Sequence, residues 1–511
     1  MNNNNKRLTL EEIELMILRT AVDKINKKVG RKVLNSPQVK DIIDIVELFL
    51  KDTGRICYGG TAINNLLPKD DQFYDKEVEL PDYDFFSPDA LNDAIKLADI
   101  YYSKGFNEVE AKAGAHHGTY KVFVNYIPVA DITYVPNVIY KKLKQESKRI
   151  NNITYCPPDF LRMSMYLELS RPLGDTSRWE KVLKRLLLLN KHWPLKGINC
   201  HEEDIQRIFQ YGTKNKIIKN KNKNKNKNKN NNDNDDNDED KFLNNIEAKI
   251  HHIIREALVD QNCVFFGAFA NKLYLRKKKS FNVSSKKIPP HADFEVLSEN
   301  PLMTATIIKE RLSKLNIKNI KVIKHDAIGE IISQHYEIKI GPESVLFIYK
   351  PMGCHSYNHV TYNRRVIRIA TIDTMFSLYL AFLFIDKPYY IKNRILCMAE
   401  HLFKVQQDNR LKQKGLLKRF SIDCYGEQLT IEKMREEKTK KYMELKDKRG
   451  TKEYDEYFLR YIPADIHKKK IKINVKKSKK VNKITVKKKK NKRKKKTKNK
   501  SKNKSKNKSK N

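Results

Sequence analysis

The sequence predicts a mixed α/β fold in two related globular blocks, and three observations lead to this prediction. Short apolar strands alternate with segments of helical spacing in both blocks. Between the blocks, a Lys-Asn repeat and an acidic run cannot bury apolar surface, so they predict a disordered linker. Each block also repeats one order of strand, glycine, carboxylates and further strands, which indicates a diverged internal duplication.

The first block is expected to begin with helices and to continue with alternating strands and helices. Thr9 can cap the first helix, and the apolar spacing of residues 39–50 predicts a second. A strand over residues 55–58 then leads into a glycine pair. Periodicity predicts the later elements: an extended segment at 83–86, a helix at 89–104, strands at 119–126 and 129–134, and helices at 160–170 and 176–192.

The amino-acid composition indicates which class of binding partner the chain favours. The chain has 511 residues, 40% of them hydrophobic, which allows two to four domains. Its 104 Lys and Arg against 61 Asp and Glu give a net charge of +43. Residues 466–511 hold 25 of the basic residues and no acidic one, yet the remainder of the chain is still basic. This balance favours an anionic partner, nucleic acid first.

Membrane-spanning and secreted classes are not expected. The most apolar stretch, residues 369–385, is short and interrupted by Asp373, so it predicts a buried helix. The N-terminus lacks the apolar core of a secretory signal. Seven widely spaced cysteines without a CxxC pair predict a reduced, intracellular chain with no disulfide framework. His201 beside Cys200 lacks a second ligand pair, so no zinc site is expected.

A glycine pair is the first part of the candidate site. Gly59 and Gly60 follow a strand and lead into a helix, so their backbone can approach phosphate oxygens and offer N–H groups. Thr61 adds a hydroxyl at the start of that helix, where the helix dipole favours anions. A glycine pair by itself is more often a simple turn.

Three carboxylates complete the candidate site. Asp82 and Asp84 stand at positions i and i+2 of an extended segment and therefore face the same side. Asp131 lies in an otherwise apolar strand, where a carboxylate is costly unless it faces a cation or a wet cleft. Alone, such residues are commonly a solvated loop or the partner of an arginine. Their order and spacing beside the glycine pair predict a site for two hard divalent cations, Mg²⁺ or Mn²⁺.

The second block repeats this order of motifs but lacks several of their residues. Ala268 stands where the first block has its second glycine, and the Asp293-Phe294-Glu295 segment keeps one aspartate of the pair. The counterpart of Asp131 falls on Leu346 or Phe347. Two cations could not be held by what remains. We therefore expect the second block to be catalytically inactive and to serve as scaffold, RNA surface or oligomer interface.

Basic and histidine residues near the site have two interpretations each. Arg178, Lys181 and Lys184 alternate with leucines, which an amphipathic helix packed on the sheet explains without a ligand. Alternatively, they flank the cleft and bind triphosphate or RNA. His116 and His117 lie in a loop between glycines, which we interpret as a solvated loop, with cleft lining as the alternative.

The arrangement resembles the nucleotidyltransferase superfamily that includes poly(A) polymerases, CCA-adding enzymes and DNA polymerase β. The segments 58–62 (Tyr-Gly-Gly-Thr-Ala), 82–85 (Asp-Tyr-Asp-Phe) and 174–180 (Gly-Asp-Thr-Ser-Arg-Trp-Glu) resemble the catalytic subunits of poxvirus and giant-virus, mimivirus-type, poly(A) polymerases. This resemblance implies a polymerase-β-like nucleotidyltransferase palm with a helical domain, followed by a degenerate second nucleotidyltransferase-like unit.

The resemblance also implies an activity and roles for the site residues. The activity is template-independent addition of AMP from ATP to mRNA 3′ ends. The metal ligands and catalytic residues would be Asp82, Asp84 and Asp131, and the nucleotide would be bound by Gly59, Gly60, Thr61, Arg178 and Lys181. The expected partners are an mRNA 3′ end, ATP, and a second copy or a partner subunit. The expected location is the virion and the viral factory in the infected cytoplasm.

Two other functions stay open at this point. The chain could be another RNA terminal nucleotidyltransferase, adding CCA or oligo(U), or a non-catalytic RNA-binding virion protein that kept the fold. The expected organisation is a helical segment at 1–35, a catalytic domain at 36–150, a helical domain at 151–213, a disordered linker at 214–240, a degenerate domain at 241–465 and a disordered Lys-rich tail at 466–511.

Overall fold

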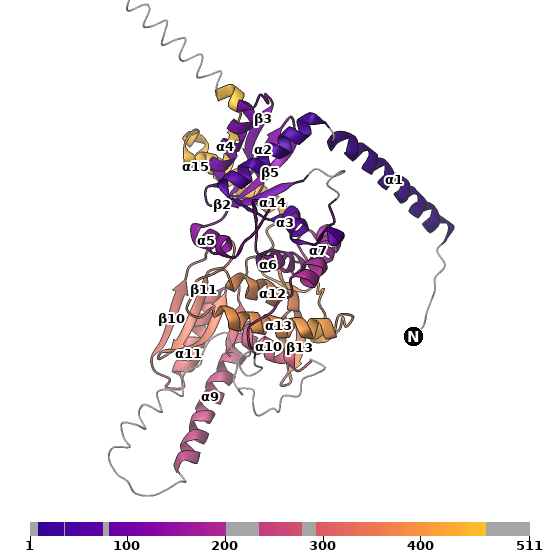
Figure 1. Ribbon diagram of the computed structural model, residues 1–511. Helices are drawn as coiled ribbons and strands as arrows, with labels where there is room; N and C mark the ends of the chain where they lie inside the picture. The colour runs from indigo at the N-terminus through magenta and orange to yellow at the C-terminus, as the bar shows by residue number, and fades with distance from the viewer. Residues whose placement is uncertain (1–8, 35, 75–80, 201–234, 278–292, 467–511) are drawn as a thin grey trace, which may run out of the picture.

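Two eight-stranded sheets organise the described part of the chain (Figure 1). The computed structural model describes residues 9–34, 36–74, 81–200, 235–277 and 293–466. A first unit forms the upper half of Figure 1 and a second unit the lower half. Helices α6 (Pro158–Leu169) and α12 (Ile372–Phe382) pack on each other between the two sheets.

The first sheet has the strand order β16-β3-β4-β5-β2-β1-β7-β6. Its strands are β1 (Ile56–Cys57), β2 (Tyr83–Ser87), β3 (Val109–Ala113), β4 (Thr119–Val124), β5 (Ile127–Tyr134), β6 (Lys148–Ile150), β7 (Ile153–Tyr155) and β16 (Arg460–Tyr461). The helices of this part are α1 (Leu10–Leu34), α2 (Pro37–Thr53), α3 (Gly59–Leu66), α4 (Ala90–Ser103), α5 (Asn137–Glu146), α6 and α7 (Trp179–His192), with 3₁₀ turns at Lys69–Asp71 and Thr176–Arg178.

Local sequence explains where these elements start and stop. Helix α2 begins with Pro37 in its first turn and ends at Gly54, which adopts φ +58° and donates its N–H to the carbonyl of Leu50. The α2 face with Ile42, Val46 and Leu50 is buried against the sheet. Helix α1 carries many exposed apolar side chains and extends away from the sheets in Figure 1.

The second sheet has the order β10-β11-β12-β9-β8-β14-β13-β15. Its strands are β8 (Val264–Phe266), β9 (Phe294–Leu297), β10 (Ile320–His325), β11 (His335–Ile340), β12 (Glu343–Tyr349), β13 (His355–Tyr362), β14 (Arg365–Ala370) and β15 (Cys424–Tyr425). The remaining helices are α9 (Asp235–Asp260), α10 (Gly267–Leu275), α11 (Pro301–Ser313), α12, α13 (Lys392–Asp408), α14 (Ile431–Leu445) and α15 (Lys452–Phe458), with 3₁₀ turns at Gly415–Leu417 and Lys446–Lys448.

The two sheets confirm the predicted duplication. Seven strands follow one order in both, because β3-β4-β5-β2-β1-β7-β6 corresponds to β10-β11-β12-β9-β8-β14-β13. The directions also agree, since β2 and β9 each run parallel to the third strand of their unit's three-stranded meander, β5 and β12. This shared register lets each residue of the first site be matched to one position of the second unit.

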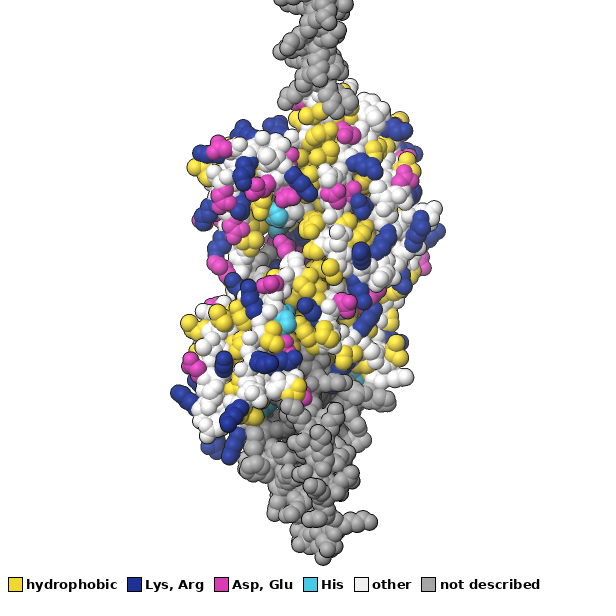
Figure 2. Space-filling view, turned by 90° about the vertical axis from the view of Figure 1, so that its left-hand side faces the viewer, with side chains coloured by type: hydrophobic (Ala, Val, Ile, Leu, Met, Phe, Trp, Pro, Cys, Tyr) yellow, Lys and Arg dark blue, Asp and Glu magenta, His cyan; other side chains and the backbone are white. Residues whose placement is uncertain are grey.

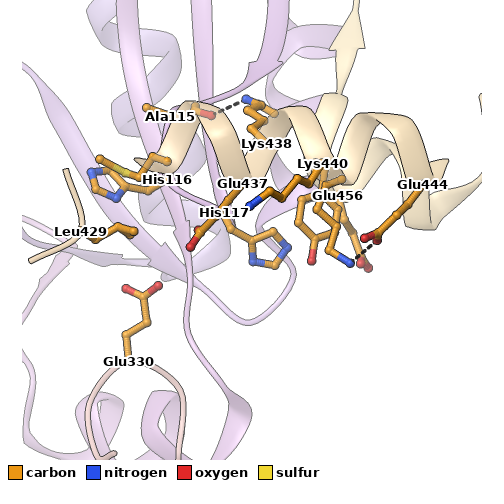
Figure 3. Close-up of a pocket in the computed structure, with 15 residues that line it drawn as sticks. Ala115, His116, His117, Glu330, Leu429, Glu437, Lys438, Lys440, Glu444 and Glu456 are labelled. Carbon is orange, nitrogen blue, oxygen red and sulfur yellow. Dashed lines mark hydrogen bonds and ion pairs between the residues drawn. The ribbon is translucent and has the colours of Figure 1, made fainter. Parts of the chain in front are cut away.

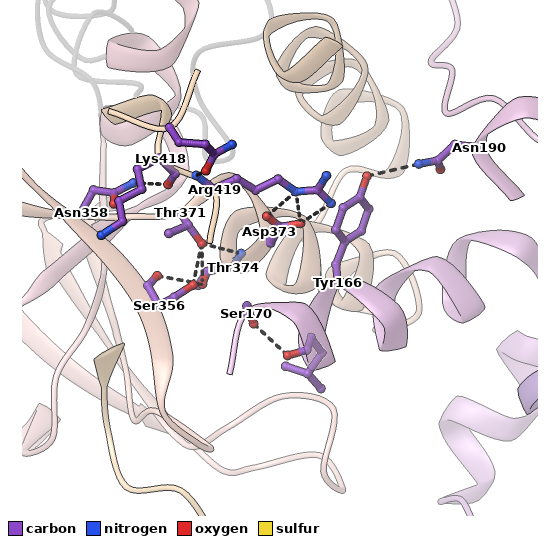
Figure 4. A network of polar contacts seen from close by, with 12 residues as sticks. Tyr166, Ser170, Asn190, Ser356, Asn358, Thr371, Asp373, Thr374, Lys418 and Arg419 are labelled. Carbon is purple, nitrogen blue, oxygen red and sulfur yellow. Dashed lines mark hydrogen bonds and ion pairs between the residues drawn. The ribbon is translucent and has the colours of Figure 1, made fainter. Parts of the chain in front are cut away.

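A buried ion pair lies where the units meet (Figure 4). Asp373 at the start of α12 is fully buried and accepts from Arg419 Nε at 2.7 Å and Nη2 at 2.8 Å. The ring of Tyr166 on α6 stacks on that of Phe376 on α12, with centroids 4.6 Å apart. The predicted buried helix over 369–385 is confirmed, and its one acidic residue is neutralised by an arginine.

The chain returns to the first unit after the second sheet. Strand β16 pairs with the edge strand β3, and Leu459 accepts from the N–H of Ala113 at 3.0 Å. The expectation that residues 241–465 form one block is therefore wrong for its last part. Helix α9 also begins at Asp235, inside the segment expected to be a disordered linker. The rest of that linker, and residues 467–511 of the predicted tail, lie outside the described residues.

The expectation of a chain without disulfides is wrong. The structure pairs Cys200 with Cys397 and Cys354 with Cys424, while the other three cysteines are buried and unbridged. The partners are 197 and 70 residues apart in sequence, so only the fold brings them together. No helix among the described residues is long and apolar enough to cross a membrane. His201 lies outside the described residues.

Candidate active site

A cleft of about 690 Å³ opens beside the ends of β2 and β5 in the first unit. It is lined by the glycine pair, all three predicted carboxylates and side chains of α6 and α7. Asp82 directly precedes β2, and Asp84 lies opposite Asp131 in the register of the parallel β2–β5 pair. Between the two aspartates, Tyr83 is buried on the other face and donates to Glu47 at 2.7 Å. The alternation expected from the sequence thus brings the three carboxylates to one cleft.

Burial and mutual repulsion raise the pKa values of two carboxyl groups in this cleft. Burial raises the pKa of Asp84 to about 7, and the negative charges of Asp82 and Asp131 add to that rise. Burial and Asp131 also raise the pKa of Asp82. Bringing these carboxylates together without a compensating cation is therefore unfavourable. The cleft has an excess of negative charge that a bound cation would relieve.

A lysine supplies part of the missing positive charge. Lys121 on β4 forms an ion pair with Asp131 through its ammonium group, and it lies opposite Asp131 in the β4–β5 register. Among the described residues, no group of three or more His, Cys, Asp or Glu side chains is drawn together tightly enough to hold an ion. The oxygen donors fit Mg²⁺ or Mn²⁺ in chemistry. To share an ion with Asp82 and Asp84, Asp131 must leave Lys121.

The glycine pair forms the floor of the cleft. Gly59 adopts φ +70°, and a β-carbon there would collide with the carboxylate of Asp84. Gly60 faces Tyr74 and Arg185, and a β-carbon on it would lie 3.0 Å from Arg185 Nη1. Thr61 does not line the cleft. It is buried and donates its hydroxyl to the carbonyl of Asp82 at 2.6 Å. This hydrogen bond connects α3 to the segment that carries Asp82 and Asp84.

One wall of the cleft is basic. Arg178, Lys181 and Arg185 line it, from the 3₁₀ turn before α7 and from α7 itself. Arg178 Nε lies 3.0 Å from Glu168 Oε1. The guanidinium of Arg185 stacks over Phe73 at 4.7 Å and donates to Tyr74 Oη at 2.8 Å. Lys184 lies outside the cleft and pairs with Glu180 at 2.6 Å. The wall faces the glycine pair, as a site for a polyphosphate requires.

The histidine loop lies at the other end of the cleft. His116 lines the cleft beside Thr119 and Thr133, while His117 does not. Thr133 Oγ1 is within 2.9 Å of Tyr58 Oη and 3.1 Å of Thr119 Oγ1. The alternative interpretation of this loop, that it reaches the cleft, is therefore correct for His116.

Among the described residues of the second unit, the matching carboxyls are buried and do not line a cleft. Phe347 lies opposite Glu295 in the β9–β12 register, so it is the counterpart of Asp131. Glu337 lies opposite Phe347 and takes the position of Lys121. Asp293 and Glu295 are 1% and 0% exposed, and Glu295 accepts from the N–H of Ala268 at 2.9 Å. Burial and the charge of Asp293 raise the pKa of Glu295 far above its usual range. These carboxyls are closed off from solvent.

Part of the first unit is similar to a known protein family. Residues 44–175 match the family model of the poly(A) polymerase catalytic subunit. The expected resemblance is thereby confirmed. The matched segment contains the glycine pair and all three carboxylates of the cleft. Arg178, Lys181 and Arg185 follow directly after it.

Two viral relatives carry this description. A protein named as a poly(A) polymerase catalytic subunit in Acanthamoeba polyphaga mimivirus is 34% identical over 163 residues, which are 31% of this chain and 27% of that protein. A protein of the same name in African swine fever virus (strain Badajoz 1971 Vero-adapted) is 31% identical over 167 residues, 32% of this chain and 35% of that protein. The match thus spans about a third or less of the length of these relatives.

The fold likeness extends over both units. The crystal structure of the Megavirus polyadenylate synthase aligns with a TM-score of 0.68 and 18% identity, covering 94% of this chain and 91% of that chain. The predicted mixed α/β fold with two related units is therefore confirmed at the level of the fold, while the degeneracy of the second unit stays a prediction.

The sequence did not reveal every residue of the cleft. Two lining residues, Tyr74 and Glu168, were not predicted from the sequence. The ion pair between Lys121 and Asp131 was not predicted either. Lys121 could have been found from strand pairing, because it faces Asp131 across a short two-residue hairpin turn. Tyr74 lies in an irregular segment with no periodicity, so no pattern in the sequence pointed to it.

Proposed function

We propose that this chain is a template-independent RNA polymerase that adds AMP from ATP to RNA 3′ ends. The observation that carries the proposal is the convergence of Asp82, Asp84 and Asp131 on a cleft with a glycine floor and a basic wall. The segment that matches the poly(A) polymerase family model includes all three carboxylates. The viral relatives and the polyadenylate synthase with the same fold support the choice of reaction.

Each part of the cleft has a role in the proposed transfer. The 3′-oxygen of the RNA attacks the α-phosphorus of ATP, the bond from that phosphorus to the β-phosphate oxygen breaks, and pyrophosphate leaves. The N–H groups of Gly59 and Gly60, with Arg178, Lys181 and Arg185, bind the triphosphate and the leaving pyrophosphate. This is positioning and charge stabilisation, which needs no covalent nucleophile from the protein.

The carboxylates are the residues that would hold the metal. Asp82, Asp84 and Asp131 would bind Mg²⁺ or Mn²⁺, which supply the positive charge that lowers the pKa of the attacking hydroxyl and stabilises the leaving group. Lys121 then moves from Asp131 to the surrounding phosphates or solvent. Thr61 keeps Asp82 in place through its main-chain contact.

Primer extension tests the proposal. The purified chain is given a 5′-labelled oligoribonucleotide, one NTP at a time and Mg²⁺ or Mn²⁺, with the Asp82→Ala/Asp84→Ala variant as control. We expect a ladder with ATP alone that the control does not make. A ladder with every NTP would keep the transferase and contradict the poly(A) assignment, and a CCA or oligo(U) pattern would name another transferase. RNA binding without extension by any NTP would favour the non-catalytic alternative.

The proposed partners and location follow from this activity. An RNA 3′ end and ATP are the substrates, and we place the chain in the virion and in the viral factory of the infected cytoplasm. Sedimentation of the chain with and without RNA measures whether it acts as a dimer. Extension by the purified chain alone measures whether a partner subunit is required.

A further inference from the structure

A second cavity adjoins the proposed active site (Figure 3). It measures about 420 Å³ and lies between the loop before β4, helices α14 and α15, and the second unit's segment before β11. His116 lines both this cavity and the catalytic cleft, so the two spaces adjoin at that residue. His117 and Tyr457 line this second cavity but not the catalytic cleft.

The returning C-terminal segment builds the outer wall of this cavity. Lys438 on α14 donates to the carbonyl of Gly114 at 2.9 Å, and Tyr120 donates to the carbonyl of Glu456 at 3.1 Å. Strand β16 adds to the same edge of the sheet. The wall is therefore fixed to the histidine loop, to β4 and to the edge strand β3. Glu330 reaches in from the second unit, so both units and the C-terminal segment contribute.

The cleft itself has two different ends. The glycine pair and Arg178, Lys181 and Arg185 occupy the end suited to the triphosphate. Thr133 lies two residues after Asp131 on β5 and contacts Thr119 on β4, and His116 lies in the loop directly before β4. An acceptor strand cannot share the triphosphate end, because its 3′-oxygen must approach the α-phosphorus opposite the leaving group. The acceptor must come in from the His116 end.

The lining of the cavity suits a nucleobase better than a phosphate. The rings of His117 and Tyr457 lie 4.3 Å apart between centroids, and Leu429 and Met434 add apolar surface. Figure 3 shows the carboxylates of Glu330 and Glu437 pointing into the same space. Acidic side chains are mixed with lysines over this face of the molecule (Figure 2). Such a mixture does not form a phosphate track, but flat rings stack on bases, and carboxylates accept hydrogen bonds from amino groups.

We propose that this cavity binds a base near the 3′ end of the acceptor RNA and favours a base with an exocyclic amino group. The base stacks on Tyr457 and His117, and Glu437 or Glu330 accepts from its amino group. A growing oligo(A) end fits this site, and an oligo(U) end does not. The inference rests on the proposed function, since it names where the acceptor of that reaction lies.

Fluorescence anisotropy with labelled oligo(A) and oligo(U) tests the site in the full chain. Because stacking on one aromatic side chain supports a base strongly, Tyr457→Ala should weaken oligo(A) binding about 5- to 100-fold. The KM for ATP should not change. Tyr454→Ala is the matched control, because Tyr454 lies on the same helix but packs on Phe458 outside the cavity. The Glu437→Gln/Glu330→Gln variant should lose the preference for oligo(A) over oligo(U).

A cross-linking experiment on the unaltered chain tests the site without relying on variants, which could misfold. RNA carrying 8-azidoadenosine, which keeps the exocyclic amino group, near its 3′ end should attach to residues 113–117, 429–444 or 456–457. Cross-links confined to other segments, or unchanged oligo(A) affinity in Tyr457→Ala, would overturn the proposed site. If oligo(A) binds and cross-links here but no NTP extends it, the site stands and the proposed polymerase activity fails.

Discussion

Asp84 is the residue whose chemistry depends most on the cleft around it. Burial and two neighbouring carboxylates raise its pKa to about 7. A carboxyl with a raised folded-state pKa contributes stability at pH values below its ordinary pKa, and this contribution is lost as pH rises through 7. Without a cation, the folded chain at pH 8 therefore carries a repulsion that the unfolded chain does not.

We expect Asp84→Asn to raise the melting temperature of the metal-free chain at pH 8 and to have little effect at pH 4, near the ordinary pKa of an aspartate. The gain at pH 8 should be on the order of 1–3 kcal/mol. Thermal unfolding in EDTA measures it, with the exposed Asp70→Asn as control. A variant that melts at the same temperature as the original chain at pH 8 would contradict the raised pKa.

Arg185 is held in place by aromatic rings rather than by a carboxylate. Its guanidinium stacks on Phe73, donates to Tyr74 and faces Gly60, at the part of the cleft where we propose that the nucleotide binds. Arg185→Gln should raise the KM for ATP by about 10- to 100-fold, because it removes a charge-assisted hydrogen bond to phosphate. Lys191→Gln, on the same helix but paired with Asp71, should leave KM unchanged. An unchanged KM in Arg185→Gln would exclude it from the nucleotide site.

The residue scale also shows what sequence patterns can predict. The convergence of Asp82, Asp84 and Asp131 follows from strand periodicity, because positions two apart in a strand share a face. The positions of Lys121 and Arg185 depend on where long side chains from other elements end. Thr61 was expected at the triphosphate, but its hydroxyl bonds to main chain instead, a contact that periodicity does not encode.

At the level of elements, α6 and α12 join the two units. Asp373 is fully buried and has Arg419 as its partner, so removing the carboxylate leaves a buried guanidinium without its counter-charge. Asp373→Asn should destabilise the chain by about 3–5 kcal/mol, visible as a large fall in melting temperature.

A double variant separates the ion pair from the packing around it. Replacing both partners, as in Asp373→Leu/Arg419→Met, should recover much of the loss, since no buried charge remains unpaired. The exposed pair of Glu436 and Lys440 serves as comparison, and Glu436→Gln should cost less than about 1 kcal/mol. If Asp373→Asn melts like the original chain, the pair does not stabilise the junction.

The sequence predicted the elements that have a clear periodicity, but it did not predict three short strands of the first sheet. The helix predicted at 89–104 is α4, and the strands predicted at 119–126 and 129–134 are β4 and β5. Strands β6, β7 and β16 have two or three residues each, too few for a pattern to emerge. Strands β6 and β16 lie at the two edges of the first sheet, while β7 lies between β1 and β6.

For the whole molecule, the duplication could be predicted and the path of the chain could not. The order of motifs indicated two related units, and seven strands in one order confirm it. The return of the C-terminal segment to the first sheet and the two disulfides depend on contacts between residues far apart in sequence. Such contacts leave no periodic pattern in the local sequence.

The Lys-rich tail belongs to this scale, because its charge acts on the whole chain. Deleting residues 466–511 removes 25 basic residues and no acidic one. We expect addition of a single nucleotide to stay intact and RNA retention at low salt to weaken, since a basic arm binds phosphates without reading bases. Extension lengths at two salt concentrations measure this effect. Unchanged processivity after truncation would argue against a tethering tail.

The central claim is that the first unit performs the transfer and the second does not. Asp84 and Glu295 occupy the same position of the two duplicated sheets, so Asp84→Asn and Glu295→Gln are matched changes that each replace one carboxyl group by its amide. Single-nucleotide addition from ATP to a labelled RNA is the measurement. Asp84→Asn should slow it at least about 100-fold, and Glu295→Gln should stay within about twofold of the original chain. Equal loss in both variants, or loss in Glu295→Gln alone with its folding intact, would contradict the account.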